Sequence, residues 1–133
     1  MLSLITNFLL RCMKLKNLIF EEAYGFMKAL GKITEQDLSI DIAYRLQKLL
    51  DEVQSKSHAY KELKVKLFKK YGKDMGDGIF TLPVDHMEAW KKFNELVAME
   101  EEYNIKKVVL SSSSGVRISA KDLSLLKDII EVK

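Results

Sequence analysis

The densest group of residues able to bind a charged partner is a run of lysines near the middle of the chain. Within thirteen positions lie Lys61, Lys64, Lys66, Lys69, Lys70 and Lys73, offset only by Glu62 and accompanied by Tyr71. Ammonium groups at this density can neutralise phosphates and make binding strongly salt-dependent. The alternative is a solvated helix end, where cations complement the negative pole of the helix macrodipole. We take these six lysines and Tyr71 as the candidate binding residues.

The lysine run is poorly suited to reading a base sequence. Guanine is usually specified by bidentate guanidinium groups. The chain has only three arginines, at Arg11, Arg45 and Arg117. A nucleic-acid partner is therefore the weaker expectation, and any such contact would be with the backbone.

Residues that could support catalysis or bind a metal are few. The chain holds two histidines and one cysteine, namely His58, His86 and Cys12. They do not lie at metal-ligand spacing; we expect His58 on a solvated helix face, and His86 has no nucleophile beside it in the sequence. The turn at 74–77 lacks the ligand pattern of an EF-hand, and the serines at 111–114 lack that of a P-loop. We expect no enzyme activity, no metal and no cofactor.

A long helix must position the lysine run. Between Lys32 and Gly72 there is no glycine or proline, and apolar residues recur at alternating steps of three and four. They are Ile42, Leu46, Leu49, Val53, Tyr60, Leu63 and Leu67, with a polar gap at Lys56. The pattern predicts a helix of about 33 residues, about 50 Å long, from near Ser39 to a left-handed Gly72. Its apolar seam needs either another helix of this chain or a second copy, which leaves a homodimer open.

Shorter elements precede and follow this helix. Asn17 as N-cap and Gly31 as stop predict a helix over residues 17–30. The turn-rich residues 73–78 and the β-prone residues 79–82 predict a small hairpin or an extended excursion.

A third helix is predicted by a capping box formed by Asp85 and Glu88. We expect it to end near Glu102 and to pack antiparallel on the long helix. The acidic run 100–102 then opposes the macrodipole. Pairing with lysines or caps of a neighbouring helix end is the economical interpretation, and a docking surface for a basic partner is the other.

The last part of the chain mixes both kinds of element. Residues 105–110 and 116–118 are predicted strands, and Ser119 is the predicted cap of a last helix that buries side chains through Ile130. The predicted fold class is mostly α (α+β), with a long heptad-patterned helix against two or three shorter helices and a small β-hairpin or two short strands.

Composition indicates one helical domain over residues 13–133. The chain has 133 residues, of which 47% are apolar and 31% charged. Residues 1–12 are too short to span a bilayer and lack the features of a secretory signal. They are a translated leader before Met13, an amphipathic extension that packs on the domain, or a weak membrane-surface helix. One cysteine fits a reducing compartment.

Three stretches carry a likeness to known proteins: the helix opening at 43–50, the helix end at 67–72 with the acidic Gly-rich turn after it, and the closing residues 118–123. In these stretches the chain resembles a family of small uncharacterised proteins of tailed phages and prophages of Gram-positive bacteria. The likeness covers about residues 13–132, although serines 111–114 replace an acidic loop. The resemblance implies a phage-encoded accessory protein in the host cytoplasm, with no catalytic residues to carry over.

Two functions remain open at this point. The first is a non-catalytic accessory protein that binds a host or viral protein through its helical surface and inhibits host machinery or assists assembly. The alternative is a nucleic-acid-associated factor that uses the lysine-rich helix end. The strong apolar seam and the mild excess of basic residues favour the first.

Overall fold

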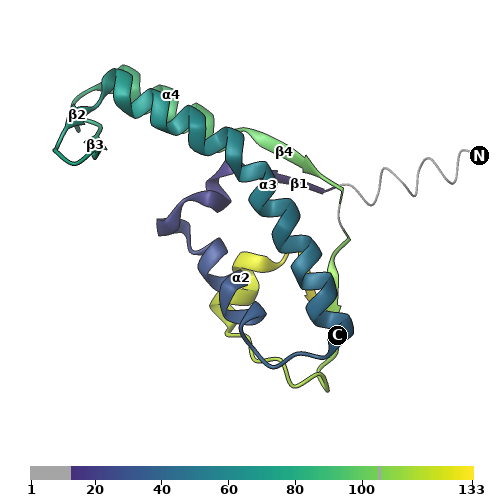
Figure 1. Ribbon diagram of the computed structural model, residues 1–133. Coiled ribbons are helices and arrows are strands. Elements are labelled where there is room, and N and C mark those ends of the chain that lie inside the picture. Colours follow the sequence, from purple (N-terminus) through teal and green to yellow (C-terminus); the bar gives the residue numbers. More distant parts are fainter. Residues whose placement is uncertain (1–12, 105) are drawn as a thin grey trace, which may run out of the picture.

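The computed structural model describes residues 13–104 and 106–133, so the predictions for residues 1–12 lie outside the described residues (Figure 1). The elements, in chain order, are β1 (Met13–Lys16), η1 (Asn17–Phe20), η2 (Glu22–Tyr24), α2 (Phe26–Thr34), α3 (Ile40–Tyr71), β2 (Lys73–Asp74), β3 (Phe80–Thr81), α4 (Met87–Ala98), β4 (Glu100–Tyr103), β5 (Val108–Leu110), α5 (Ala120–Leu126) and β6 (Ile130–Val132). Helices dominate and the strands are short. The predicted mostly α (α+β) class is confirmed.

The long helix α3 begins and ends where its sequence predicts. The Ser39 hydroxyl accepts a hydrogen bond from the backbone N–H of Ile42 at 3.4 Å, and Gly72 follows the last helical residue. With 32 residues, the helix is about 48 Å long. Its N-terminal half packs on α2 and β5, whereas α4 runs antiparallel beside its C-terminal half (Figure 1).

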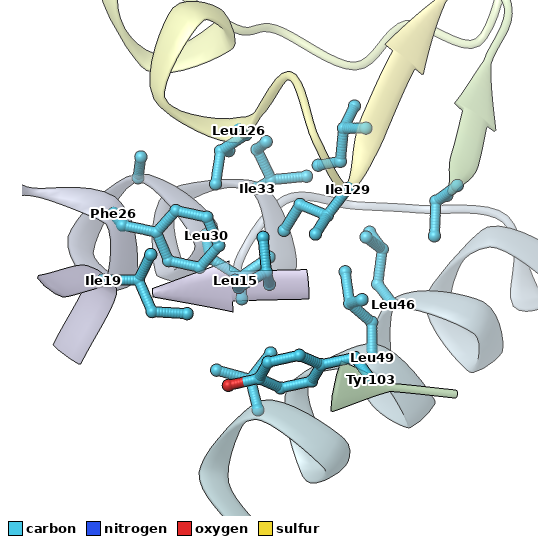
Figure 2. Close-up of a cluster of buried hydrophobic side chains, with 14 of the residues drawn as sticks. Leu15, Ile19, Phe26, Leu30, Ile33, Leu46, Leu49, Tyr103, Leu126 and Ile129 are labelled. Atoms are coloured by element: carbon cyan, nitrogen blue, oxygen red, sulfur yellow. The ribbon is translucent and has the colours of Figure 1, made fainter. Parts of the chain in front are cut away.

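The main core lies under the N-terminal half of α3. Figure 2 shows side chains from helices and strands far apart in sequence meeting there, among them Phe26, Leu30, Ile33, Leu46, Leu49, Tyr103, Leu126 and Ile129. The seam residues Leu46, Leu49, Val53 and Tyr60 are buried by elements of the same chain, while Leu63 stays 50% exposed. The chain itself therefore covers most of the seam, and a homodimer stays a prediction.

The predicted third helix is too long by several residues. Helix α4 ends at Ala98, and Glu100–Tyr103 form β4 in an antiparallel pair with β1. The register places Lys14 opposite Glu102 and Lys16 opposite Glu100. Opposite charges across two strands stabilise the pair, so the acidic run pairs with lysines of a strand rather than those of a helix end.

The predicted helix over 17–30 is wrong in its bounds. Asn17 does not cap a helix that follows it: its side-chain amide donates to the Leu96 carbonyl at 3.0 Å, and its backbone N–H donates to the Met99 carbonyl at 2.9 Å. These bonds satisfy groups at the end of α4. Two short 3-10 turns follow, and α2 starts only after Gly25, which has φ of 89°. Gly31 lies inside α2 rather than after it.

The C-terminal strands also differ from the prediction. Val116–Ile118 form no strand, and the predicted first strand is limited to β5; Ile105 lies outside the described residues. The partner of β5 is β6, which runs parallel to it and pairs Val108 with Ile130. A parallel pair needs a crossover, and α5 supplies it, starting at the predicted cap Ser119, whose hydroxyl accepts from the Asp122 N–H at 3.1 Å.

Gly72 is required for a different reason from the predicted left-handed turn. Its backbone is extended, with φ of −87° and ψ of 166°. A Cβ at this position would collide with the Phe68 carbonyl oxygen and lie 2.9 Å from that of Thr81. Glycine therefore allows β3 to approach the end of α3. Strand β3 pairs with β2 and so forms the predicted hairpin.

The N-cap of α4 is one residue later than predicted. His86, rather than Asp85, occupies the position, and its Nδ1 accepts from the Ala89 N–H at 3.3 Å. The Trp90 indole N–H donates to the Pro83 carbonyl at 2.8 Å, which fixes the approach to the helix. No helix in the described residues is both long enough and apolar enough to cross a bilayer.

Candidate functional site

The lysine run belongs to an arm, which we define as α3 from Lys61 onward, the β2–β3 hairpin and α4 (Figure 1). Aromatic side chains join its two helices. Phe68 of α3 packs edge-on against Phe93 of α4 with ring centroids 5.6 Å apart, and Trp90 packs on Phe93 at 5.9 Å. Such pairs stabilise beyond their buried area, so the arm has its own apolar layer away from the main core.

Lys64 does not lie with the other predicted binding lysines. Its ammonium is 2.8 Å from a Glu21 carboxylate oxygen and lies over the rings of Phe68 and Phe93, at 5.5 and 5.6 Å. Tyr60 donates its hydroxyl to the same carboxylate at 2.6 Å. Burial and this acceptor raise the pKa of Tyr60. Lys64 therefore helps to join the arm to η1 and η2, and its charge is already neutralised.

The other five predicted lysines face solvent. Lys61, Lys66, Lys69, Lys70 and Lys73 are exposed. Within residues 13–104 and 106–133, none of the five lies in an ion pair. Residues spaced by three and four share a helix face, which brings Lys66, Lys69 and Lys70 together. We call these five residues the basic patch.

Tyr71 is held by lysines on both helices of the arm. Its hydroxyl accepts from the Lys92 ammonium at 2.7 Å, and the ammonium groups of Lys92 and Lys70 lie 5.0 and 5.2 Å from its ring centroid. The hydrogen bond from Lys92 is the main cause that lowers the pKa of Tyr71. His86 packs edge-on against the ring at 5.2 Å. The phenol is thus oriented within the arm rather than free to stack on a ligand.

Four large apolar side chains near the end of the arm are exposed, which the sequence pattern did not predict. Met75 and Ile79 of the hairpin are 58% and 60% exposed, and Val84 and Met87 at the start of α4 are 91% and 80% exposed. We call these four residues the apolar tip. The Met75 N–H donates to the Ile79 carbonyl at 2.8 Å across the turn, and Val84 and Met87 follow the hairpin in the chain. Exposed apolar residues close to one another can mark an interaction site. The signal available in the sequence was the presence of large apolar residues on both sides of the Gly76-Asp77-Gly78 turn.

The apolar tip continues into a depression along α4. The depression has a volume of about 710 Å³ and is lined by Met87, Glu88, Trp90, Lys91, Asn94, Glu95 and Ala98. Met87 belongs to both features, so the tip and the depression form one surface. Its lining includes Trp90, and tryptophan is among the side chains most often central to protein interfaces.

The remaining candidates form no site. His58 lies exposed on α3, 3.2 Å from Glu62. The residues around Asp74 form a turn in which its carboxylate accepts from the Gly76 N–H at 2.8 Å. The serines at 111–114 form a turn closed by their own hydroxyl groups. In the part of the chain that the structure describes, no cluster of three histidine, cysteine or carboxylate ligands occurs.

Comparison with known proteins gives no match to a family model, to a curated protein or to a solved structure.

Proposed function

We propose that this chain is a non-catalytic accessory protein that binds a partner protein through its arm. The observation that supports the proposal best is the apolar tip and its continuation into the depression along α4. The resemblance to phage proteins makes a host or phage protein the partner and the host cytoplasm the compartment. The simplest consequence of such binding is inhibition of the host machinery to which the partner belongs.

The tip has the composition of a protein-binding surface. Methionine is flexible and polarisable, so Met75 and Met87 can fit a partner of irregular shape. Ile79 and Val84 add exposed apolar area that water covers in the free protein. Burying four such side chains gives a stable contact only against an apolar partner surface, which a nucleic-acid backbone does not offer.

The basic patch defines the rest of the partner. Lys69 and Lys70 lie at the end of α3, and Lys73 begins β2 of the hairpin. Because none of the five lysines forms an ion pair in the described residues, a partner with carboxylates around an apolar centre would complement the arm. Charges at the rim of an interface mainly raise the association rate and select the partner.

A nucleic-acid partner is the second candidate, supported by the five unpaired lysines of the basic patch. Two observations disfavour it. Lys64 is neutralised by Glu21, and the Tyr71 ring is flanked by Lys70 and Lys92, which limits base stacking.

Affinity capture from host cells, with nuclease treatment and a salt series, tests the proposal with two pairs of matched variants. In the first pair, the test variant carries Ile79→Ser and Met87→Ser in the tip. Its control carries Val109→Ser and Val132→Ser, at exposed apolar positions outside the arm. The second pair replaces Lys66, Lys69 and Lys70 with glutamate, against the same change at the exposed Lys28, Lys121 and Lys127.

The proposal predicts a protein that the native chain retains after nuclease treatment. The tip variant should retain about tenfold less of it, since a central apolar contact contributes about 1–2 kcal/mol. The lysine variant should also retain less, because charge reversal at the rim slows association, and both control variants should retain it fully. Loss of every captured protein after nuclease treatment would contradict the proposal and favour the nucleic-acid alternative.

A further inference from the structure

A second surface lies in the body of the molecule, away from the arm. It is a cleft of about 800 Å³ between the N-terminal half of α3 and the residues that join β4 to β5. Residues 45–52 of α3 form one wall and residues 104 and 106–108 form the other. Small-molecule sites in proteins commonly measure about 300–1,000 Å³. The cleft is therefore large enough for a ligand of nucleotide size.

Positive charge lines both walls of the cleft. Arg45 and Lys48 extend from α3, and Lys106 and Lys107 extend from the opposite segment. Arg45 is 3.4 Å from Asp41, one turn earlier on the helix. For Lys48, Lys106 and Lys107, no ion pair is found in the described part of the chain. The lining holds four cationic side chains and two carboxylates, Asp51 and Glu52, so its net charge is positive and favours an anionic ligand.

The cleft also offers groups for the uncharged part of a ligand. Leu49 and Val108 are 1% and 3% exposed and give it an apolar floor. Asn104, Asp51 and Glu52 add amide and carboxylate groups to the lining. Carboxylates accept hydrogen bonds from hydroxyl groups such as those of a ribose. The lining thus combines four cationic side chains, two carboxylates that can accept hydrogen bonds, and an apolar floor.

We propose that this cleft binds a small phosphorylated ligand of the nucleotide class, with its phosphates between Lys48 and Lys107 and its hydroxyl groups toward Asp51 and Glu52. The site is independent of the arm and does not rest on the proposed function. It would give the protein a means of responding to a small metabolite while the arm holds a partner.

Isothermal titration calorimetry with adenosine diphosphate and with pyrophosphate, each against the full chain, tests the site. Adenosine is the uncharged control. The variants are Lys48→Ala and Lys107→Ala, one from each wall. The matched control is the Lys69→Ala, Lys70→Ala double variant, which removes charge from the arm. Circular dichroism checks that each variant is folded.

The proposal predicts saturable 1:1 binding of a phosphorylated probe and none of adenosine. Each cleft variant should bind about tenfold more weakly, because each loses a charge-assisted hydrogen bond, and the arm variant should bind within about twofold of the native chain. The proposal is overturned if neither probe binds at millimolar concentration. It is also overturned if the arm variant loses as much affinity as the cleft variants, since attraction would then be to net charge alone.

Discussion

Replacing Glu21 with alanine should loosen the arm from the body, because this one carboxylate holds two residues of α3. It accepts a hydrogen bond from the Tyr60 hydroxyl at 2.6 Å and two from the Lys64 ammonium at 2.8 and 3.0 Å. The Glu21→Ala variant would leave a buried hydroxyl and a partly buried ammonium without their acceptor. Neither group has another hydrogen-bond partner in the described residues.

The expected cost follows from how deeply each group is buried. Tyr60 is 3% exposed, so the loss of its bond to a charged acceptor should cost about 2 kcal/mol. The side chains of Lys64 and Glu21 are 32% and 21% exposed, and solvent screening limits their ion pair to about 0.5–1 kcal/mol. The free energy of unfolding should therefore fall by about 2.5–3 kcal/mol, and the melting temperature by roughly 10 °C.

Urea unfolding followed by circular dichroism measures this change. The matched control is Glu22→Ala, because the Glu22 side chain is exposed and forms no ion pair within the described residues. That variant should stay within about 0.5 kcal/mol of the native chain. A double-mutant cycle with Lys64→Met should give a coupling energy of about 0.5–1 kcal/mol. The reasoning fails if Glu21→Ala costs no more than the control or if the two single changes simply add.

Three further predictions concern the arm and the core. In urea titrations, Gly72→Ala should lower the free energy of unfolding by more than about 2 kcal/mol, since its Cβ would meet backbone oxygens. Gly31→Ala, with open space around it inside α2, should raise that free energy by about 0.5–1 kcal/mol, and the opposite order would refute the argument. Tyr103→Phe should leave stability unchanged or raise it by up to about 1 kcal/mol, because the buried hydroxyl has no partner among the described residues; a clear loss would reveal one. In a pH titration followed at 295 nm, Tyr71 should ionise before Tyr60 and Tyr103, because the Lys92 hydrogen bond lowers its pKa whereas burial raises theirs, and Lys92→Met should abolish this early step. Early ionisation that persists in Lys92→Met would contradict that cause.

The features that sequence predicted well depend on local interactions. Ser39 and Gly72 bound α3 because a cap and a stop act within one turn. The heptad seam identified Leu46, Leu49 and Val53 as buried, since helical periodicity fixes one face whatever covers it. Five of the six candidate lysines lie on this helix and Lys73 lies just after it in β2, whereas the Glu21 partner of Lys64 was not predicted.

The features that sequence missed depend on partners far along the chain. Residues 100–103 form a strand only because β1 lies beside them, more than eighty positions earlier. Ile130 leaves the last helix because β5 pairs with it. Lys64 is neutralised by Glu21, forty-three positions away. Local propensity carries no information about such contacts, and the exposure of the apolar tip is equally a property of the assembled fold.

Site-specific photo-crosslinking tests most directly the claim that the arm binds a partner protein. A benzophenone amino acid would replace Met87 at the tip in one variant and Val109 in the body in another, both in nuclease-treated extracts of host cells. The account predicts one discrete crosslinked protein from the Met87 position and none from the Val109 position. The same protein crosslinked equally from both positions, or from the body alone, would contradict it.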